Sequence, residues 1–312
     1  MSFIQILLVI APVFLVIGVG HVAVRGGLLT DAAVDGVMRY ANYLAFPVLL
    51  FSAIARMDLS ANYNPALLAT FYLGSTNSFI LAMLGARYIF KRDWQDAVVI
   101  GFGGLFTNAF LLGIPISERA LGADALGPNF AIISVHSPYC YTLGVIAMEI
   151  ARAEGKGIIA TLRAIGASMI RNPLIIAIVS GFTVNLSGID LPKLIWDAVD
   201  LIARGAVPAA LVALGGVLTR YNFGRSLGAA SMVATLSLIV HPMIVFLLGT
   251  HVFHLDDGAF NSALLTAAMA PGVNIYIFAT IYQRAMGAAA STLILATSLS
   301  VITVSAWMLL LR

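Results

Sequence analysis

Two apolar stretches of the sequence are interrupted by the same three residue types, and these residues could bind an anion. The stretches read "FTNAFLLGIP" at 106–115 and "APGVNIYIF" at 270–278. They contain Asn108, Gly113 and Pro115, and Pro271, Gly272 and Asn274, respectively. A broken helix exposes backbone N–H groups with positive partial charge, and an asparagine side chain adds a donor and an acceptor. The pattern therefore predicts that a carboxylate could bind without a buried arginine.

The same residues also have a purely structural interpretation. Proline and glycine are common in membrane helices, and an asparagine can simply bridge two neighbouring helices. Either stretch alone leaves the two interpretations open. Because matched interruptions in two halves of a chain point to the binding site of a transporter, the pair favours a site.

A further polar group lies in the apolar stretch "SVHSPYCYT" at 134–142, which contains His136 and Ser137. His136 falls near the middle of its apolar run, where a histidine could titrate or contact substrate. A neutral histidine that donates one hydrogen bond to a neighbouring helix fits the pattern equally well. His241, directly before Pro242, is interpreted as structural.

Composition identifies the elements that must position these residues as membrane helices. Of the 312 residues, 61% are hydrophobic and 10% are charged, with a mean hydropathy of +0.99. A soluble domain has about 25% charged residues, so the sequence excludes a soluble domain of appreciable size. The single cysteine, Cys140, excludes a disulfide framework, and the five histidines lack the spacing of metal ligands. We expect no metal, no other cofactor and no nucleic-acid partner.

Apolar runs predict an all-α polytopic membrane protein with ten transmembrane helices. The first run is interpreted as a span rather than a secretory signal, because it lacks a basic start and a small-residue cleavage site. The ten predicted spans are 3–24, 37–55, 65–88, 97–117, 128–150, 168–189, 198–219, 226–250, 259–282 and 286–311.

The distribution of basic residues predicts the orientation of these spans. With the amino terminus outside, twelve of the 17 lysines and arginines fall on the inner side. The other five are Arg56, Arg119, Lys193, Arg204 and Arg312. The positive-inside rule therefore places both termini outside the plasma membrane.

A charged linker divides the chain into two halves of five spans each. It begins with "ARAEGKG" and covers 151–163, between a first repeat at 1–150 and a second at 164–312. Since five is an odd number, any repeat must be inverted. Four proline and glycine positions recur 161 residues later: Pro12, Gly20, Gly27 and Pro47 match Pro173, Gly181, Gly188 and Pro208.

Five motifs in order resemble the auxin efflux carrier family, within the wider bile acid and arsenite carrier superfamily. They are "NYLAFPVLLFSAIA", "TNAFLLGIP", the "NP" at 172–173, "VPAALVALGGVL" and "APGVNIYIFATIY". The resemblance implies two inverted five-helix repeats with broken, crossing helices 4 and 9. It also implies a scaffold of helices 1, 2, 6 and 7, a transport unit of helices 3–5 and 8–10 that moves as an elevator, and a homodimer.

The resemblance also suggests which residues form the substrate site. The crossover asparagine and proline of the first half fall on Asn108 and Pro115. The corresponding positions of the second half fall on Pro271, Gly272 and Asn274. A polar position of the fifth span falls on His136, where a glutamine is expected.

Two departures from plant members limit what can be transferred. The long hydrophilic loop between spans five and six is replaced by the short linker, so the chain resembles the short-loop bacterial branch, whose usual substrates are malonate and other small organic acids. The carboxylate expected in span three is absent from "GSTNSF" at 74–79. Proton or sodium coupling is therefore left open.

The sequence thus predicts a secondary active transporter of a small organic anion, such as a carboxylate or dicarboxylate, across the inner membrane. A gated anion channel and a sodium-coupled symporter similar to bile acid carriers remain as alternatives. A membrane enzyme is not expected, because the sequence lacks paired intramembrane aspartates, an "HExxH" motif and a catalytic serine with its base.

Overall fold

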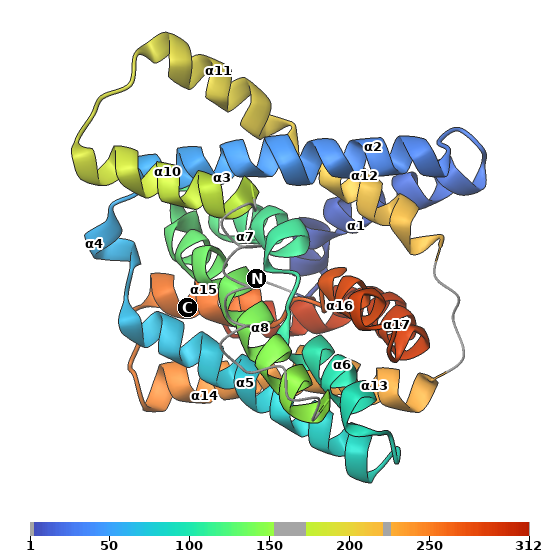
Figure 1. Ribbon diagram of the computed structural model, residues 1–312. Coiled ribbons are helices and arrows are strands. Elements are labelled where there is room, and N and C mark those ends of the chain that lie inside the picture. Colours follow the sequence, from blue (N-terminus) through green and yellow to red (C-terminus); the bar gives the residue numbers. More distant parts are fainter. Residues whose placement is uncertain (1–2, 153–172, 221–225, 312) are drawn as a thin grey trace. The chain divides into compact units, whose positions relative to one another are not determined.

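The computed structural model describes residues 3–152, 173–220 and 226–311, and within these ranges the chain is helical without a single strand. Among the described residues, seven helical stretches are long and apolar enough to cross a membrane. They are Leu8–Arg25, Asp31–Arg56, Pro65–Tyr88, Gly127–Arg152, Lys193–Leu218, Leu227–His251 and Met286–Met308. The protein is therefore a polytopic helical membrane protein, as predicted (Figure 1).

The described residues form two compact units. The larger unit takes residues from 3–11, 64–152 and 226–311, and the smaller unit from 12–63 and 173–220. Helix α1 (Phe3–Arg25) contributes to both, with the boundary at Pro12. The predicted linker at 151–163 lies outside the described residues from position 153 onwards.

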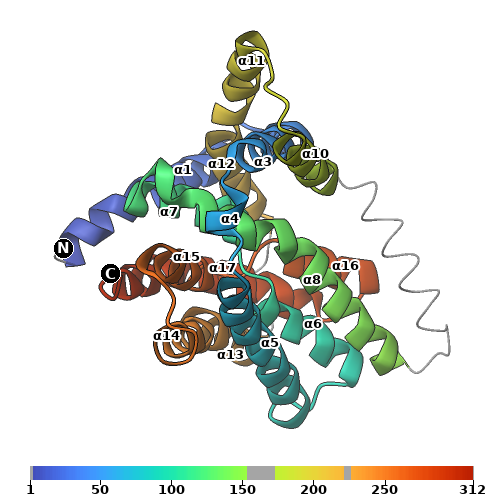
Figure 2. The same cartoon turned by 90° about the vertical axis from the view of Figure 1, so that its left-hand side faces the viewer.

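The larger unit contains both interrupted stretches. Its helices after α1 are α5 (Pro65–Tyr88), α6 (Trp94–Leu105), α7 (Ile114–Leu121), α8 (Gly127–Arg152), α13 (Leu227–Thr235), α14 (His241–His251), α15 (Asp257–Ala267), α16 (Asn274–Tyr282) and α17 (Met286–Met308). A short 3₁₀ helix, Ala123–Leu126, precedes α8. Figure 2 shows α5 beside α6, where Gly104 faces the backbone of Ser78.

The smaller unit is built from α2 (Asp31–Tyr40), α3 (Phe46–Arg56), the short α4 (Leu59–Asn62), α10 (Pro173–Ser187), α11 (Lys193–Arg204) and α12 (Ala206–Leu218), together with the rest of α1. Helix α3 packs against α10 (Figure 1). Gly20 of α1 and Gly215 of α12 face each other's helix so closely that a Cβ atom on either would overlap backbone. Small residues of this kind allow membrane helices to approach closely.

Three wide π-helical turns share one cause. They are η1 (Ala41–Ala45), η2 (Ala109–Gly113) and η4 (Leu236–Val240), and each ends two residues before a proline: Pro47, Pro115 and Pro242. Proline lacks an N–H group, and its ring clashes with the carbonyl group four residues earlier in an α-helix. A wider turn makes room for the ring, which explains how the apolar stretches tolerate these prolines.

Side-chain caps fix where the helices of the larger unit begin. Asn64 accepts a hydrogen bond from the Ala66 N–H ahead of α5 (2.8 Å). Asp93 and Asp256 play the same part for α6 and α15, accepting from Asp96 N (2.8 Å) and Ala259 N (2.9 Å). Each cap satisfies one of the N–H groups that a helix start leaves unpaired.

Candidate functional site

The two interrupted stretches meet through their backbones inside the larger unit. Helix α6 ends at Leu105 and α15 ends at Ala267, and the extended residues that follow pair as an antiparallel bridge between Thr107 and Pro271. The Asn108 N–H donates to the Ala270 carbonyl (2.7 Å), and the Gly272 N–H donates to the Phe106 carbonyl (3.0 Å). We call residues 106–108 and 270–272 the crossing.

Asn108 is buried at the crossing and offers an unused donor. Its Oδ1 atom accepts a hydrogen bond from Leu111 N (3.1 Å), which caps the turn η2. Its Nδ2 atom is buried and has no hydrogen-bond partner among the described residues. Since an unpaired buried donor typically costs about 1–3 kcal/mol, a bound acceptor would relieve that cost.

Asn274 lies on the other side of the crossing, at the start of α16. Its Oδ1 atom accepts a hydrogen bond from the Tyr141 hydroxyl group of α8 (2.8 Å). Gly272 lies between the two asparagines: a Cβ atom there would be 3.6 Å from Asn108 Cα and 3.7 Å from Asn274 Nδ2. With Oδ1 occupied, the Nδ2 group of Asn274 remains as its donor.

His136 of α8 also reaches the crossing. Its Nε2 atom lies 3.2 Å from the Thr107 carbonyl oxygen and 3.5 Å from Thr107 Oγ1. On the same helix, Cys140 Sγ lies 3.7 Å from His136 Nδ1. The ring is enclosed by Phe71, Tyr72 and Phe106, with ring centroids 5.7, 6.1 and 4.7 Å away.

The remaining predicted site residues lie further from this arrangement. Gly113 closes the turn η2, and a Cβ atom there would be 3.8 Å from Met269 Cγ, just ahead of the second break. Pro115 is buried in the first turn of α7, two residues after the end of η2, and it does not belong to the crossing. Ser137 is half-buried beside His136, and the described contacts do not connect it to the crossing. His241 bonds the Phe71 carbonyl through Nε2 (3.3 Å).

Sequence reasoning missed Thr107 and Tyr141. Thr107 supplies the bridge and the carbonyl group that faces His136. Tyr141 holds Asn274, 133 positions further along the chain. The one available signal was that a tyrosine hydroxyl in an apolar span needs a hydrogen-bond partner.

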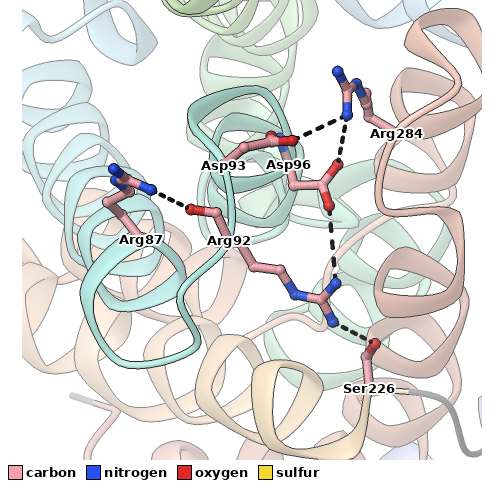
Figure 3. A network of polar contacts seen from close by, with 6 residues as sticks. All are labelled: Arg87, Arg92, Asp93, Asp96, Ser226 and Arg284. Carbon is pink, nitrogen blue, oxygen red and sulfur yellow. Dashed lines mark hydrogen bonds and ion pairs between the residues drawn. The ribbon is translucent and has the colours of Figure 1, made fainter.

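Charged side chains gather elsewhere in the larger unit, at the loop between α5 and α6 (Figure 3). Arg284, in the turn between α16 and α17, lies 3.0 Å from an Asp93 oxygen and 3.9 Å from an Asp96 oxygen. Arg92 lies 3.9 Å from Asp96 and donates to Ser226 Oγ (3.2 Å). We call this group the charged cluster.

The charged cluster perturbs one carboxyl group. Asp96 lies just ahead of the predicted span at 97–117, and burial raises its pKa above the ordinary value of 3.8. Neighbouring Asp93 raises the pKa further, whereas Arg284 and Arg92 lower it. Within the described residues, no group of histidine, cysteine, aspartate and glutamate side chains could hold a metal ion.

Comparison with known proteins agrees with the resemblance seen in the motifs. A family model described as "Membrane transport protein" matches residues 5–308. The chain belongs to the auxin efflux carrier family of membrane transport proteins. The protein is therefore a multi-pass membrane transporter.

Individual proteins also match over most of the chain. A "Putative malonate transporter" of Rhizobium meliloti (strain 1021) is 24% identical over 97% of this chain and 95% of its own length. An "Uncharacterized transporter" of Methanothermobacter thermautotrophicus is 22% identical over 97% of both chains. A mouse "Lysosomal cholesterol signaling protein" is 23% identical over 93% of this chain but only 36% of its own length.

Proposed function

We propose that this protein is a secondary active transporter of a small organic anion, and that the anion binds at the crossing. The observation that carries the proposal is the unpartnered, buried Nδ2 group of Asn108 beside the second break. The name of the Rhizobium relative favours malonate as the first substrate to test.

The proposed site binds a carboxylate through neutral donors. One carboxylate oxygen would accept from Asn108 Nδ2, and the other from Asn274 Nδ2 and the N-terminus of α16. Hydrogen bonds between neutral donors and an ionised acceptor are roughly twice as strong as those between neutral groups. A site without a buried cation also lets the empty transporter return without an unpaired charge in the membrane, which is costly.

We further propose ten membrane crossings in two inverted repeats. The ten would be the seven long helical stretches, the shorter α10, and two broken helices, α6–η2–α7 and α15–α16. The helical segments on either side of each break are too short to cross a bilayer alone. The paired backbones at the crossing satisfy N–H and carbonyl groups that lipid could not.

The loops ahead of α6 and α15 support the repeat, because their backbone geometry matches with an offset of 163 positions. Lys91 and His254 both have positive φ, at 55° and 46°. Arg92 N donates to Ala86 O (3.0 Å), and Leu255 N donates to Gly249 O (2.9 Å). The capping aspartates, Asp93 and Asp256, follow at the same offset.

We also propose that both termini lie outside the plasma membrane, as the positive-inside rule predicts. The ion pairs support the division of the loops between two sides of the membrane. Arg220 pairs with Asp31 (3.0 Å) and Asp35 (2.7 Å), all assigned to the inner side. The charged cluster joins residues assigned to that same side. Arg56 pairs with Asp200 (2.8 Å) near the other side. No recorded pair joins opposite sides among the described residues.

The two compact units support an elevator mechanism. The smaller unit holds the helices that the family resemblance assigns to the scaffold, except for the part of α1 before Pro12, and the larger unit holds those of the transport unit. Because the crossing lies wholly inside the larger unit, that unit could carry a bound anion as one body. We propose that a homodimer forms through the smaller unit.

Transport by the purified protein in liposomes tests the function. Labelled malonate should show saturable counterflow, and Asn108→Ala and Asn274→Ala should abolish it. Asn77→Ala is the matched control, since Asn77 lies in the same unit, is exposed and donates to Leu73 O of its own helix (2.8 Å). Equal transport by all three variants would contradict the site.

The alternatives give different results in the same liposomes. Single-channel conductance with malonate would favour a gated anion channel. Loss of uptake when sodium is replaced by choline would favour a sodium-coupled symporter. Saturable counterflow without conductance and without a sodium requirement would support the carrier.

A further inference from the structure

We infer that His136 binds a proton together with the anion, which would make the protein a proton–anion symporter. The inference rests on the proposed anion site at the crossing. It starts from the contact between His136 Nε2 and the Thr107 carbonyl oxygen at 3.2 Å. Thr107 directly precedes Asn108, whose Nδ2 group is the unpartnered donor.

The Thr107 carbonyl fixes which nitrogen of His136 carries hydrogen in the neutral ring. A carbonyl oxygen only accepts hydrogen bonds, so Nε2 must be the donor. Nδ1 then carries the lone pair that can accept a proton. Its recorded neighbour is Cys140 Sγ at 3.7 Å, and the sulfur atom also lies 3.8 Å from the Leu105 carbonyl. Protonation at Nδ1 therefore leaves the Nε2 contact with the crossing intact.

Other titratable groups around His136 form contacts of their own. From α5, the Tyr72 hydroxyl donates to the Ile132 carbonyl (2.7 Å), and Tyr139 of α8 pairs with Thr76. From α14, His241 also contacts the Phe71 ring, with ring centroids 5.1 Å apart. No aspartate, glutamate, lysine or arginine has a recorded contact with His136 among the described residues.

An imidazolium in this place lacks a counter-ion until an anion arrives. Burial without a partner disfavours the charged ring, and an anion bound next to Asn108 would supply the missing negative charge. Binding of the proton and of the anion must then strengthen each other by the same factor. The proton would enter with the anion on one side of the membrane and leave with it on the other, so each anion would carry one proton.

His241 offers a matched control. It is also fully buried, and its Nε2 atom also faces a backbone carbonyl, that of Phe71 (3.3 Å). That carbonyl belongs to an ordinary stretch of α5 rather than to the crossing. A proton on His241 would therefore lie next to no bound anion in the proposed site.

Binding measured against pH tests the coupling. Titration calorimetry of the purified protein with malonate, succinate and lactate should run from pH 7 to 8.5, where these acids are fully ionised. If one proton accompanies each anion, the apparent Kd should rise about tenfold per pH unit. His136→Gln keeps an N–H donor for the Thr107 carbonyl but cannot titrate, so its Kd should not change with pH. His241→Gln should keep the parental slope.

Proton movement gives a second readout. Malonate entering liposomes that contain a pH-sensitive dye should acidify the interior with one proton per malonate. In His136→Gln, the number of protons that accompany each labelled malonate should fall to zero, whatever the rate of malonate entry.

Different negative results would count against the proton coupling and against the proposed transport function. Binding or transport that is independent of pH in the parent would overturn the coupling and leave the carrier intact. A parental slope in His136→Gln, or a lost slope in His241→Gln, would place the proton elsewhere. If none of the three acids binds at any pH, the proposed function and the coupling both fail.

Discussion

The two units each contain an asparagine whose side chain meets interrupted backbone, yet the two amides are used differently. In the smaller unit, Asn185 Nδ2 lies within hydrogen-bond distance of three carbonyls at the end of α3, those of Ile54 (3.0 Å), Ala55 (3.2 Å) and Met57 (2.7 Å). In the larger unit, Asn108 Nδ2 has no partner among the described residues. A satisfied amide ties helices together, whereas an unsatisfied one leaves a donor for a ligand.

The largest expected effect is on anion binding by Asn108→Ser. Serine can still cap the turn η2, as an asparagine does, but it lacks the Nδ2 donor. A hydrogen bond to a charged group contributes about 1.5–3 kcal/mol, so malonate affinity should fall roughly 10- to 150-fold. Calorimetry measures the affinity and a thermal melt measures the stability. If the variant lost stability but kept its malonate affinity, Asn108 would have a structural role like that of Asn185.

Asn185→Ala should show the opposite pattern. Removal of the amide leaves carbonyls at the end of α3 without their donor, which should lower the free energy of unfolding by about 1–3 kcal/mol. Malonate affinity should stay at the parental value, because the crossing lies in the other unit. Chemical unfolding in detergent followed by tryptophan fluorescence checks the first part, and a weakened affinity in the folded variant would argue against the second.

Tyr141→Phe should have an intermediate effect. The Tyr141 hydroxyl group holds Asn274 Oδ1, so its loss frees the amide to rotate and should weaken malonate binding by a few-fold to about tenfold. Tyr139→Phe is the control, because that hydroxyl pairs with Thr76 of α5. Equal losses in the two variants would mean that Tyr141 does not act through Asn274.

The smallest effect is expected from Asp96→Asn in the charged cluster. Burial raises the pKa of Asp96 in the folded protein above 3.8, so the folded state holds this proton more tightly than the unfolded state. That contribution to stability is present at low pH and is lost as pH rises from about 3.8 through the folded pKa. The variant should flatten this part of a plot of melting temperature against pH, without a change in malonate affinity at neutral pH.

Local features of the sequence were enough to predict a polytopic helical membrane protein and its long apolar helices. Apolar length predicted a helix at 65–88, and α5 covers those residues, because a bilayer sets a minimum length for such runs. Pro271 and Gly272 lie at the second break, as predicted, whereas the first break begins after Leu105, ten residues before Pro115. Pro115 is preceded instead by the wide turn η2.

Partners that are distant in the sequence could not be predicted in this way. The bridge between Thr107 and Pro271 joins residues from different halves of the chain, and no periodicity encodes such a pairing. One alternative for His136 was a hydrogen bond to a neighbouring helix, whereas its Nε2 atom faces the Thr107 carbonyl in the break between two helices. The role of these residues in substrate binding stays a prediction.

The wide turns ahead of Pro47, Pro115 and Pro242 affect how labelling experiments on this protein should be planned. Each π turn holds an additional residue, which rotates everything after it by about 100° relative to a continuous α-helix. A cysteine scan of 31–56 or 227–251 interpreted on a single helical wheel would therefore assign the accessible face correctly before the turn and wrongly after it. Two wheels, separated at the proline, are needed for each of these helices.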